Sequence, residues 1–163
     1  MCTLRLSFST LFAFLISCVL SFPTWGLAQG SVQGAWKVVE VSFTSTDTSW
    51  TNKSPQPGIF IFTEKHYNDM YVRGNEPRKV ADPSNRTDDE TVAAYNSFHA
   101  NSGTYEVLSS SKLTTRTMVA KSPTRMADAY INEYVYEIDG NTLWLTDTTS
   151  SGGKYVRKYT RLE

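Results

Sequence analysis

Short runs rich in β-branched and aromatic residues alternate with polar turns along most of the chain. Residues 58–63 (GIFIFT) are apolar on both faces, as expected of a strand that is covered on each side. Eight such runs are long enough to be strands: residues 34–44, 58–63, 66–72, 104–108, 112–121, 129–138, 142–147 and 154–163. Most are separated by only a few residues, which predicts hairpins, and Asp139-Gly140 is the strongest of these turn signals.

One segment has a helical pattern instead. Thr87 and Glu90 are spaced as in a capping box, in which each side chain bonds the backbone amide of the other residue. Val92, Tyr95 and His99 follow at helical spacing, and residues 101–103 (NSG) provide a stop. We therefore predict a helix over residues 88–100 that covers one opening of the fold.

The strands follow one another with short connections, which predicts an all-β fold. An eight-stranded antiparallel up-and-down barrel fits this order, and its closure removes the exposed edges of an open sheet. A two-sheet sandwich is the alternative, but it needs long crossing connections. Only the segment that holds the helix is long enough for one, so the barrel is favoured. Residues 45–57 and 73–86 are expected to be surface loops.

The first 28 residues differ in kind from the rest. Arg5 is followed by an apolar run over residues 6–22, and the small residues Gly26 and Ala28 end the segment, which is typical of a secretory signal peptide. We expect cleavage just after Ala28, which leaves one domain over residues 29–163. The mature protein would then be secreted or periplasmic.

Two alternatives to cleavage are open. An uncleaved membrane anchor is disfavoured because serines interrupt the apolar run, whereas a spanning helix needs about 20 strongly apolar residues. Lipid anchoring at Cys18 is suggested by residues 15–18 (LISC), which look like the box before a lipidated cysteine in bacterial lipoproteins. The apolar residues just after Cys18 and the cleavage site downstream weigh against it.

Charge and cysteine content narrow the possible partners. Cys2 and Cys18 both lie in the predicted signal peptide, so the mature domain has no cysteine and cannot rely on disulfides. Without Arg5, 15 basic residues face 16 acidic ones, which argues against nucleic acid or an anionic membrane surface as a partner. His66 and His99 are too few for a metal site without cysteine, so we expect no metal and no cofactor.

Several motifs carry a resemblance to a known family. The first strand opens with Gly34-Ala35-Trp36, the G-x-W pattern of lipocalins. The segments PQPGIFIFTEKHY, NSGTYEV, SPTRM and YEIDGNTLWLT are similar to the bacterial lipocalin-like domain family, a group with calycin-type barrels. The resemblance covers nearly all of the mature chain. The chain lacks the disulfide cysteines and later loop motifs of true lipocalins, which argues against retinoid or odorant transport.

The resemblance implies an eight-stranded barrel with a short helix, in exported or enzyme-associated proteins with no agreed set of catalytic residues. It also implies that an arginine of the last strand lies over Trp36 and closes the barrel floor beside Gly34. Arg161 is the preferred counterpart, and Arg157 is the second choice.

Strand alternation predicts which side chains face the barrel interior. In the strand over residues 129–138, Tyr130, Asn132, Tyr134 and Tyr136 share one face, and the other face is half acidic, so the tyrosine face is placed inside. By the same rule Tyr155, Arg157, Tyr159 and Arg161 face inward. The predicted ligand-binding residues are Trp36, Tyr67, Tyr71, His99, Tyr130, Asn132 and Tyr134. The alternative is that these tyrosines only fill the core.

Three functions fit this sequence. The favoured hypothesis is a monomeric binding protein that holds a small amphipathic or aromatic molecule in the barrel. The second is a cyclase or isomerase in which His99 or a lumen tyrosine moves a proton, although His99 is also explained as a helix residue bonded to a neighbour. The third is a module that binds a protein partner through the loops at 45–57 and 73–86. No phosphate loop, nucleophile elbow or C-x-x-C pair is present, so binding is favoured over catalysis.

Overall fold

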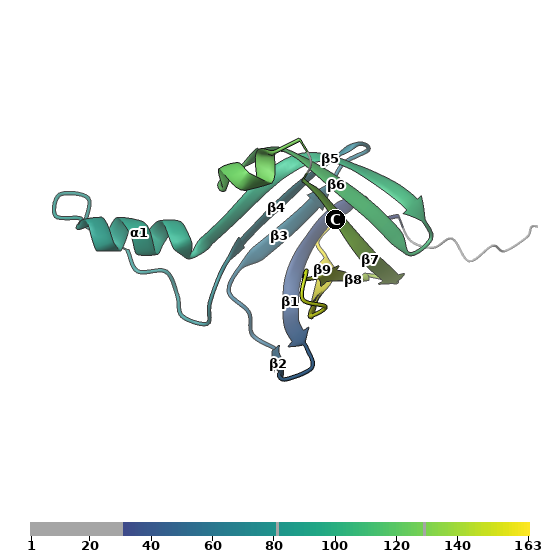
Figure 1. Ribbon diagram of the computed structural model, residues 1–163, viewed down its shortest axis with the longest axis horizontal. Helices are drawn as coiled ribbons and strands as arrows, with labels where there is room; N and C mark the ends of the chain where they lie inside the picture. The colour runs from purple at the N-terminus through teal and green to yellow at the C-terminus, as the bar shows by residue number, and fades with distance from the viewer. Residues whose placement is uncertain (1–30, 81, 129) are drawn as a thin grey trace, which may run out of the picture.

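The computed structural model describes residues 31–80, 82–128 and 130–163. Nine strands of these residues form a single antiparallel sheet that curls into a barrel (Figure 1). The strands are β1 (Gly34–Thr44), β2 (Ser49–Asn52), β3 (Gly58–Phe62), β4 (His66–Val72), β5 (Phe98–Ser109), β6 (Lys112–Ala120), β7 (Ile131–Asp139), β8 (Thr142–Thr148) and β9 (Lys154–Arg161). One α-helix, α1 (Asp88–Asn96), and one 3-10 helix, η1 (Pro123–Met126), complete the described elements. The predicted signal peptide, residues 1–28, lies outside the described residues.

The first and last strands close the barrel. β1 pairs with β9 from Trp36 opposite Arg161 to Thr44 opposite Lys154, with a bulge between Val38 and Glu40. The other edge of β1 pairs with β3 in its first half and with β2 in its second half. Eight strands therefore form the closed wall, as the sequence predicts, and β2 is a short extension beside β1. β2 is only four residues long and mostly polar, so its sequence does not predict a strand, and the prediction of a loop over residues 45–57 is wrong at these four positions.

The helix begins where the capping box predicts but ends early. The Thr87 hydroxyl accepts from the Glu90 amide at 3.2 Å, and the Glu90 carboxylate accepts from the Thr87 amide at 3.0 Å. The prediction that the helix continues to residue 100 is wrong, because β5 begins at Phe98 and pairs with β4. His99 is therefore a strand residue and not a helix residue.

The prediction that the helix covers an opening is also wrong. No residue of α1 is buried, and the helix extends away from the barrel wall in Figure 1. It is held at the side of the barrel by Lys121, whose ammonium lies 3.9 Å from the centre of the Tyr95 ring and donates to the Phe98 carbonyl at 2.6 Å. Thus α1 does not cover the cavity, whereas Arg125 of η1 is one of the residues that line it.

Apolar side chains fill one end of the barrel. The six large side chains with almost no exposure are Trp36, Phe60, Phe62, Leu113, Leu143 and Leu145. Phe60 packs on Phe62 with ring centres 4.3 Å apart, and its ring stacks with Tyr67 at 5.8 Å. The predicted inner face of β7 is confirmed, since Tyr134 and Tyr136 are buried while Val135 between them is exposed. This apolar end is a solid floor.

Two further features can be stated for the part of the chain that the structure describes. No helix there combines the length and apolar character needed to cross a membrane. No cluster of three or more His, Cys, Asp or Glu side chains there is arranged to hold a metal ion.

Candidate functional site: a cavity in the open half of the barrel

The barrel floor is closed by contacts between the chain ends of the described domain. The Arg161 guanidinium lies 4.0 Å from the centre of the Trp36 ring, the geometry of a cation–π contact. Its two terminal nitrogens donate to the carbonyls of Gln33 at 2.6 Å and Ser31 at 2.8 Å. The Trp36 indole donates to the Val32 carbonyl at 2.7 Å. Trp36 thus belongs to the floor, and Arg161 rather than Arg157 is the arginine that lies over it.

Above this floor the barrel holds a cavity of about 830 Å³ that is open at the mouth. Its walls come from strands far apart in the sequence, chiefly β1, β2, β3, β4, β8 and β9. The aliphatic part of the wall is Val38, Val41, Pro55, Ile59, Met70 and Val72; the aromatic part is Trp50, Tyr71, Tyr155 and Tyr159; the charged part is Asp69, Arg73, Arg125, Asp147 and Arg157. A cavity of this size is in the range that binds small molecules.

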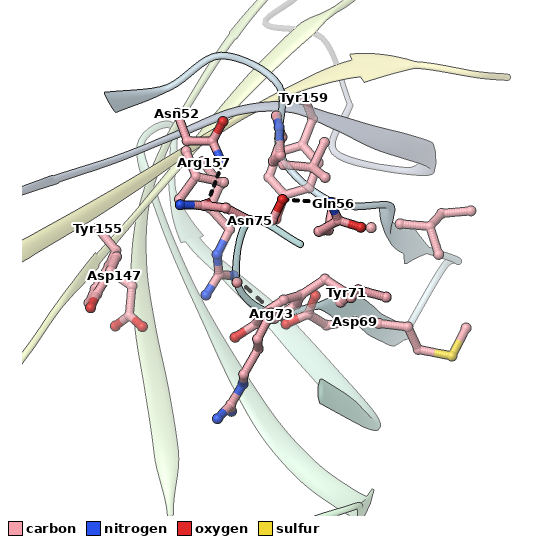
Figure 2. Close-up of a pocket in the computed structure, with 18 of the residues that line it drawn as sticks. Asn52, Gln56, Asp69, Tyr71, Arg73, Asn75, Asp147, Tyr155, Arg157 and Tyr159 are labelled. Carbon is pink, nitrogen blue, oxygen red and sulfur yellow. Dashed lines mark hydrogen bonds and ion pairs between the residues drawn. The ribbon is translucent and has the colours of Figure 1, made fainter. Parts of the chain in front are cut away.

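Charged side chains meet in the middle of the cavity wall. Figure 2 shows Asp69, Tyr71, Arg73 and Arg157 gathered in one region of the pocket. The Asp69 Oδ2 lies 3.8 Å from the Arg157 Nη1 and 3.5 Å from the His99 Nε2. The Arg157 guanidinium also lies 4.9 Å from the centre of the Tyr71 ring. Asp69 is 3% exposed, so its carboxylate depends on the Arg157 guanidinium and the His99 ring in place of water.

His99 lies behind Tyr71 and is not part of the cavity lining. Its ring stacks on Tyr71 with centres 4.4 Å apart, and it is 5% exposed. The Nδ1 lies 3.1 Å from a terminal nitrogen of Arg73, and because a guanidinium can only donate, Nδ1 is the acceptor. The Nε2 lies 2.6 Å from the Asn101 amide nitrogen and 3.5 Å from the Asp69 Oδ2. His99 therefore contacts residues that line the cavity, among them Tyr71 and Arg73, without lining it itself.

Burial keeps the inner tyrosines protonated. Loss of hydration raises the pKa of Tyr134 and of Tyr159 well above the usual value, although the positive charge of Arg157 partly opposes this. Burial also raises the pKa of Tyr67, whose hydroxyl shares a 2.9 Å hydrogen bond with the Thr117 hydroxyl. These phenols are therefore neutral hydrogen-bonding groups at physiological pH and add no negative charge to the interior.

An aromatic cluster stands at the mouth of the cavity. The Phe43 ring is 4.5 Å from Tyr155 and 6.2 Å from Trp50, between ring centres. Trp50 is 44% exposed, although it belongs to the cavity wall. The predicted loops at 45–57 and 73–86 meet beside this cluster, where the Asn52 amide donates to the Asn75 side-chain oxygen at 3.0 Å. The mouth is therefore bordered by aromatic faces and by hydrogen-bonded loops.

The structure separates the seven residues predicted to bind a ligand. Tyr71 lines the cavity. Trp36, Tyr67 and Tyr134 are buried in the packed floor and core. His99 lies behind Tyr71, and the remaining two, Tyr130 and Asn132, are partly buried near the start of β7 without lining the cavity.

Several wall residues were not among the predicted site residues. Asp69 and Tyr71 are two positions apart on β4, so alternation puts them on the same face. The same rule places Arg157 inward, but alternation alone does not distinguish the floor of the barrel from the cavity. Asp147 shares the inward face of β8 with Leu143 and Leu145, so alternation also places it inside. Trp50 carried no signal, because the short strand β2 is not visible in the sequence.

Comparison with known proteins identifies a family. A family model described as a lipocalin-like domain matches residues 33–161. No curated protein matches the chain. Among solved structures, a redesigned β-barrel is similar, with 14% sequence identity and a TM-score of 0.42 over 80% of this chain and 91% of the other.

Proposed function

The chain belongs to the lipocalin-like domain family, and from that premise we propose that it binds a small amphipathic or aromatic molecule in the open half of its barrel. The observation that carries this proposal is the cavity of about 830 Å³ above a solid aromatic floor. If the inner side chains only filled the barrel, this volume would be occupied by protein.

The composition of the wall supports an amphipathic ligand. Val38 and Val41 offer an apolar surface on one side, and Tyr71 and Tyr155 offer ring faces. Burial of apolar ligand surface against such a wall is favourable by about 25 cal/mol per Å². The charged groups around Asp69 and Arg157 give the ligand a polar end to bind, so a molecule with one apolar and one polar end uses the whole site.

Binding is tested with Nile red, a neutral dye that fluoresces when it enters an apolar environment. We expect the purified protein to bind it, and we expect Val41→Trp to weaken binding by about tenfold or more, because the larger ring occupies the cavity beside Arg157. Val135→Trp is the matched control, since Val135 is on the outer face of β7 and is 46% exposed. Equal binding by all three proteins would place the dye elsewhere and refute a lumen site.

We also propose that the protein is exported, on the strength of the charge at Arg5, the apolar run and the small residues before Gln29. Expression of the full chain in a bacterial host should then give a mature protein outside the cytoplasm whose N-terminal sequence begins at Gln29. A variant with Ala28→Leu should accumulate uncleaved, because signal peptidase needs a small residue there. Recovery of a chain that starts at Cys18 and carries lipid would favour the anchored alternative, and an uncleaved cytoplasmic chain would refute export.

A further inference from the structure

Arg157 is a largely buried cation in a wall that combines apolar, aromatic and charged side chains. It lies on β9 opposite Val41 of β1 and Leu145 of β8, and its side chain is 14% exposed. A charge removed from water is costly unless ion pairs and hydrogen bonds replace its hydration. The groups that surround Arg157 therefore show what the site still lacks.

The pairing of Arg157 within the protein is incomplete. Its closest carboxylate oxygen, Asp69 Oδ2, is 3.8 Å from Nη1, which is too long for a hydrogen bond. Among the described residues, the buried Nη1 has no hydrogen-bond partner. The same Asp69 oxygen also lies 3.5 Å from His99 Nε2. The group missing from this site is an acceptor, since a guanidinium nitrogen can only donate.

The charges along the wall also favour an anionic ligand. Three arginines, Arg73, Arg125 and Arg157, line the cavity with two aspartates, Asp69 and Asp147. The inner phenols do not offset the excess positive charge, because burial raises the pKa of Tyr159 and keeps it neutral. An anion that enters the cavity would restore the charge balance, whereas a cation would add to the excess.

We propose that the cavity selects ligands that carry a carboxylate, with the carboxylate hydrogen-bonded to Arg157 Nη1 and the apolar body of the ligand against Val38, Val41 and Trp50. This inference rests on the proposed function, because it assigns a chemical class to the ligand of the same cavity. The planar fork of arginine matches the two oxygens of a carboxylate, which strengthens the bond and fixes the orientation of the ligand.

The test compares two molecules of the same shape. Naphthaleneacetate and naphthaleneacetamide differ in charge at neutral pH, while their ring systems are identical. Isothermal titration calorimetry should show the acid binding about tenfold or more tightly than the amide to the wild-type protein, because a hydrogen bond to a charged group is stronger than one between neutral groups. Equal affinities, with Nile red still bound, would overturn the carboxylate proposal and leave the lumen site standing. Failure of Nile red to bind would refute both the lumen site and the carboxylate proposal.

Variants locate the preference at Arg157. The double variant Asp69→Asn with Arg157→Gln removes both charges together, so that neither partner is left as an unpaired buried ion. It should lose the preference for the acid, so that naphthaleneacetate and naphthaleneacetamide bind with similar affinity. Lys158→Gln is the matched control, since it removes a positive charge from the next residue of β9, whose ammonium lies over the outer Trp144 ring at 5.5 Å. It should keep the preference.

An acid preference that survives in the double variant, or disappears in Lys158→Gln, would refute the assignment to Arg157. If the double variant does not fold, the wild-type comparison and the Lys158→Gln result decide the proposal.

Discussion

Gly34 lies where the first strand of the barrel meets the last, and its backbone has a φ of 125°, a region that side chains disfavour. A Cβ atom there would lie 2.5 Å from the Glu163 carbonyl oxygen and 2.6 Å from the Arg161 Nη1. The same carbonyl accepts from the Ala35 amide, and the Arg161 guanidinium lies over Trp36. The glycine thus allows the close approach that seals the floor, which gives the G-x-W pattern a physical reason at its first position.

Gly34→Ala should lower the free energy of unfolding by about 1 to 3 kcal/mol, since it adds backbone strain and displaces Arg161 from Trp36. Urea denaturation followed by tryptophan fluorescence measures the change. Gly152→Ala separates the two causes, because Gly152 has a φ of 85° but nothing within 4 Å of its Cβ position. The free energy of unfolding of that variant should fall only by the strain of the backbone conformation. If the two variants are equally destabilised, the contact with Arg161 and Glu163 has no measurable role.

The boundary between α1 and β5 shows where local pattern stops determining structure. The capping box correctly predicts where the helix begins, because its hydrogen bonds join residues three apart. The C-terminal end of the helix depends on distant residues. His99, Asn101 and Gly103 also satisfy the two-residue period of a strand, and they pair with Tyr71, Asp69 and Tyr67 of β4. Only the presence of β4 alongside decides between the two periods.

The strands explain why the barrel could be predicted and the cavity could not. The alternation within β7 and β9 correctly predicts which side chains face inward, including Arg157. Whether an inward residue belongs to the floor or to the cavity depends on the register between strands. Tyr134 lies opposite Leu113 of β6 and is packed in the core, whereas Arg157, opposite Val41, is in the open half. Register is set by the closure of all eight strands together, which no single run of residues specifies.

The barrel as a whole has an apolar end and a polar end. Trp36, Phe62 and Leu143 occupy the floor, and Asp69, Arg157 and Asp147 lie above them along the same inner faces. Tyr134 and Tyr159 lie between the two ends, with rings in the core and hydroxyls near the charged layer, where Asp69 and Arg157 both affect their pKa. The stability of the whole barrel therefore depends on these phenols staying protonated.

This dependence predicts loss of stability at alkaline pH. Burial raises the pKa of Tyr134 and Tyr159 in the folded protein, while in the unfolded chain both titrate near the ordinary value of about 10. Below that pH both states are protonated, and the full stability is present. Above it the unfolded chain releases protons that the folded barrel retains, so the free energy of unfolding falls by about 1.4 kcal/mol per pH unit for each such tyrosine.

Urea denaturation between pH 8 and about pH 11 measures this slope. Tyr134→Phe should reduce the slope by the share of one tyrosine, and Tyr95→Phe, which changes a half-exposed ring on α1, should leave it unchanged. A slope that is the same in the wild type and in Tyr134→Phe would mean that this phenol is not protected from solvent in the folded barrel.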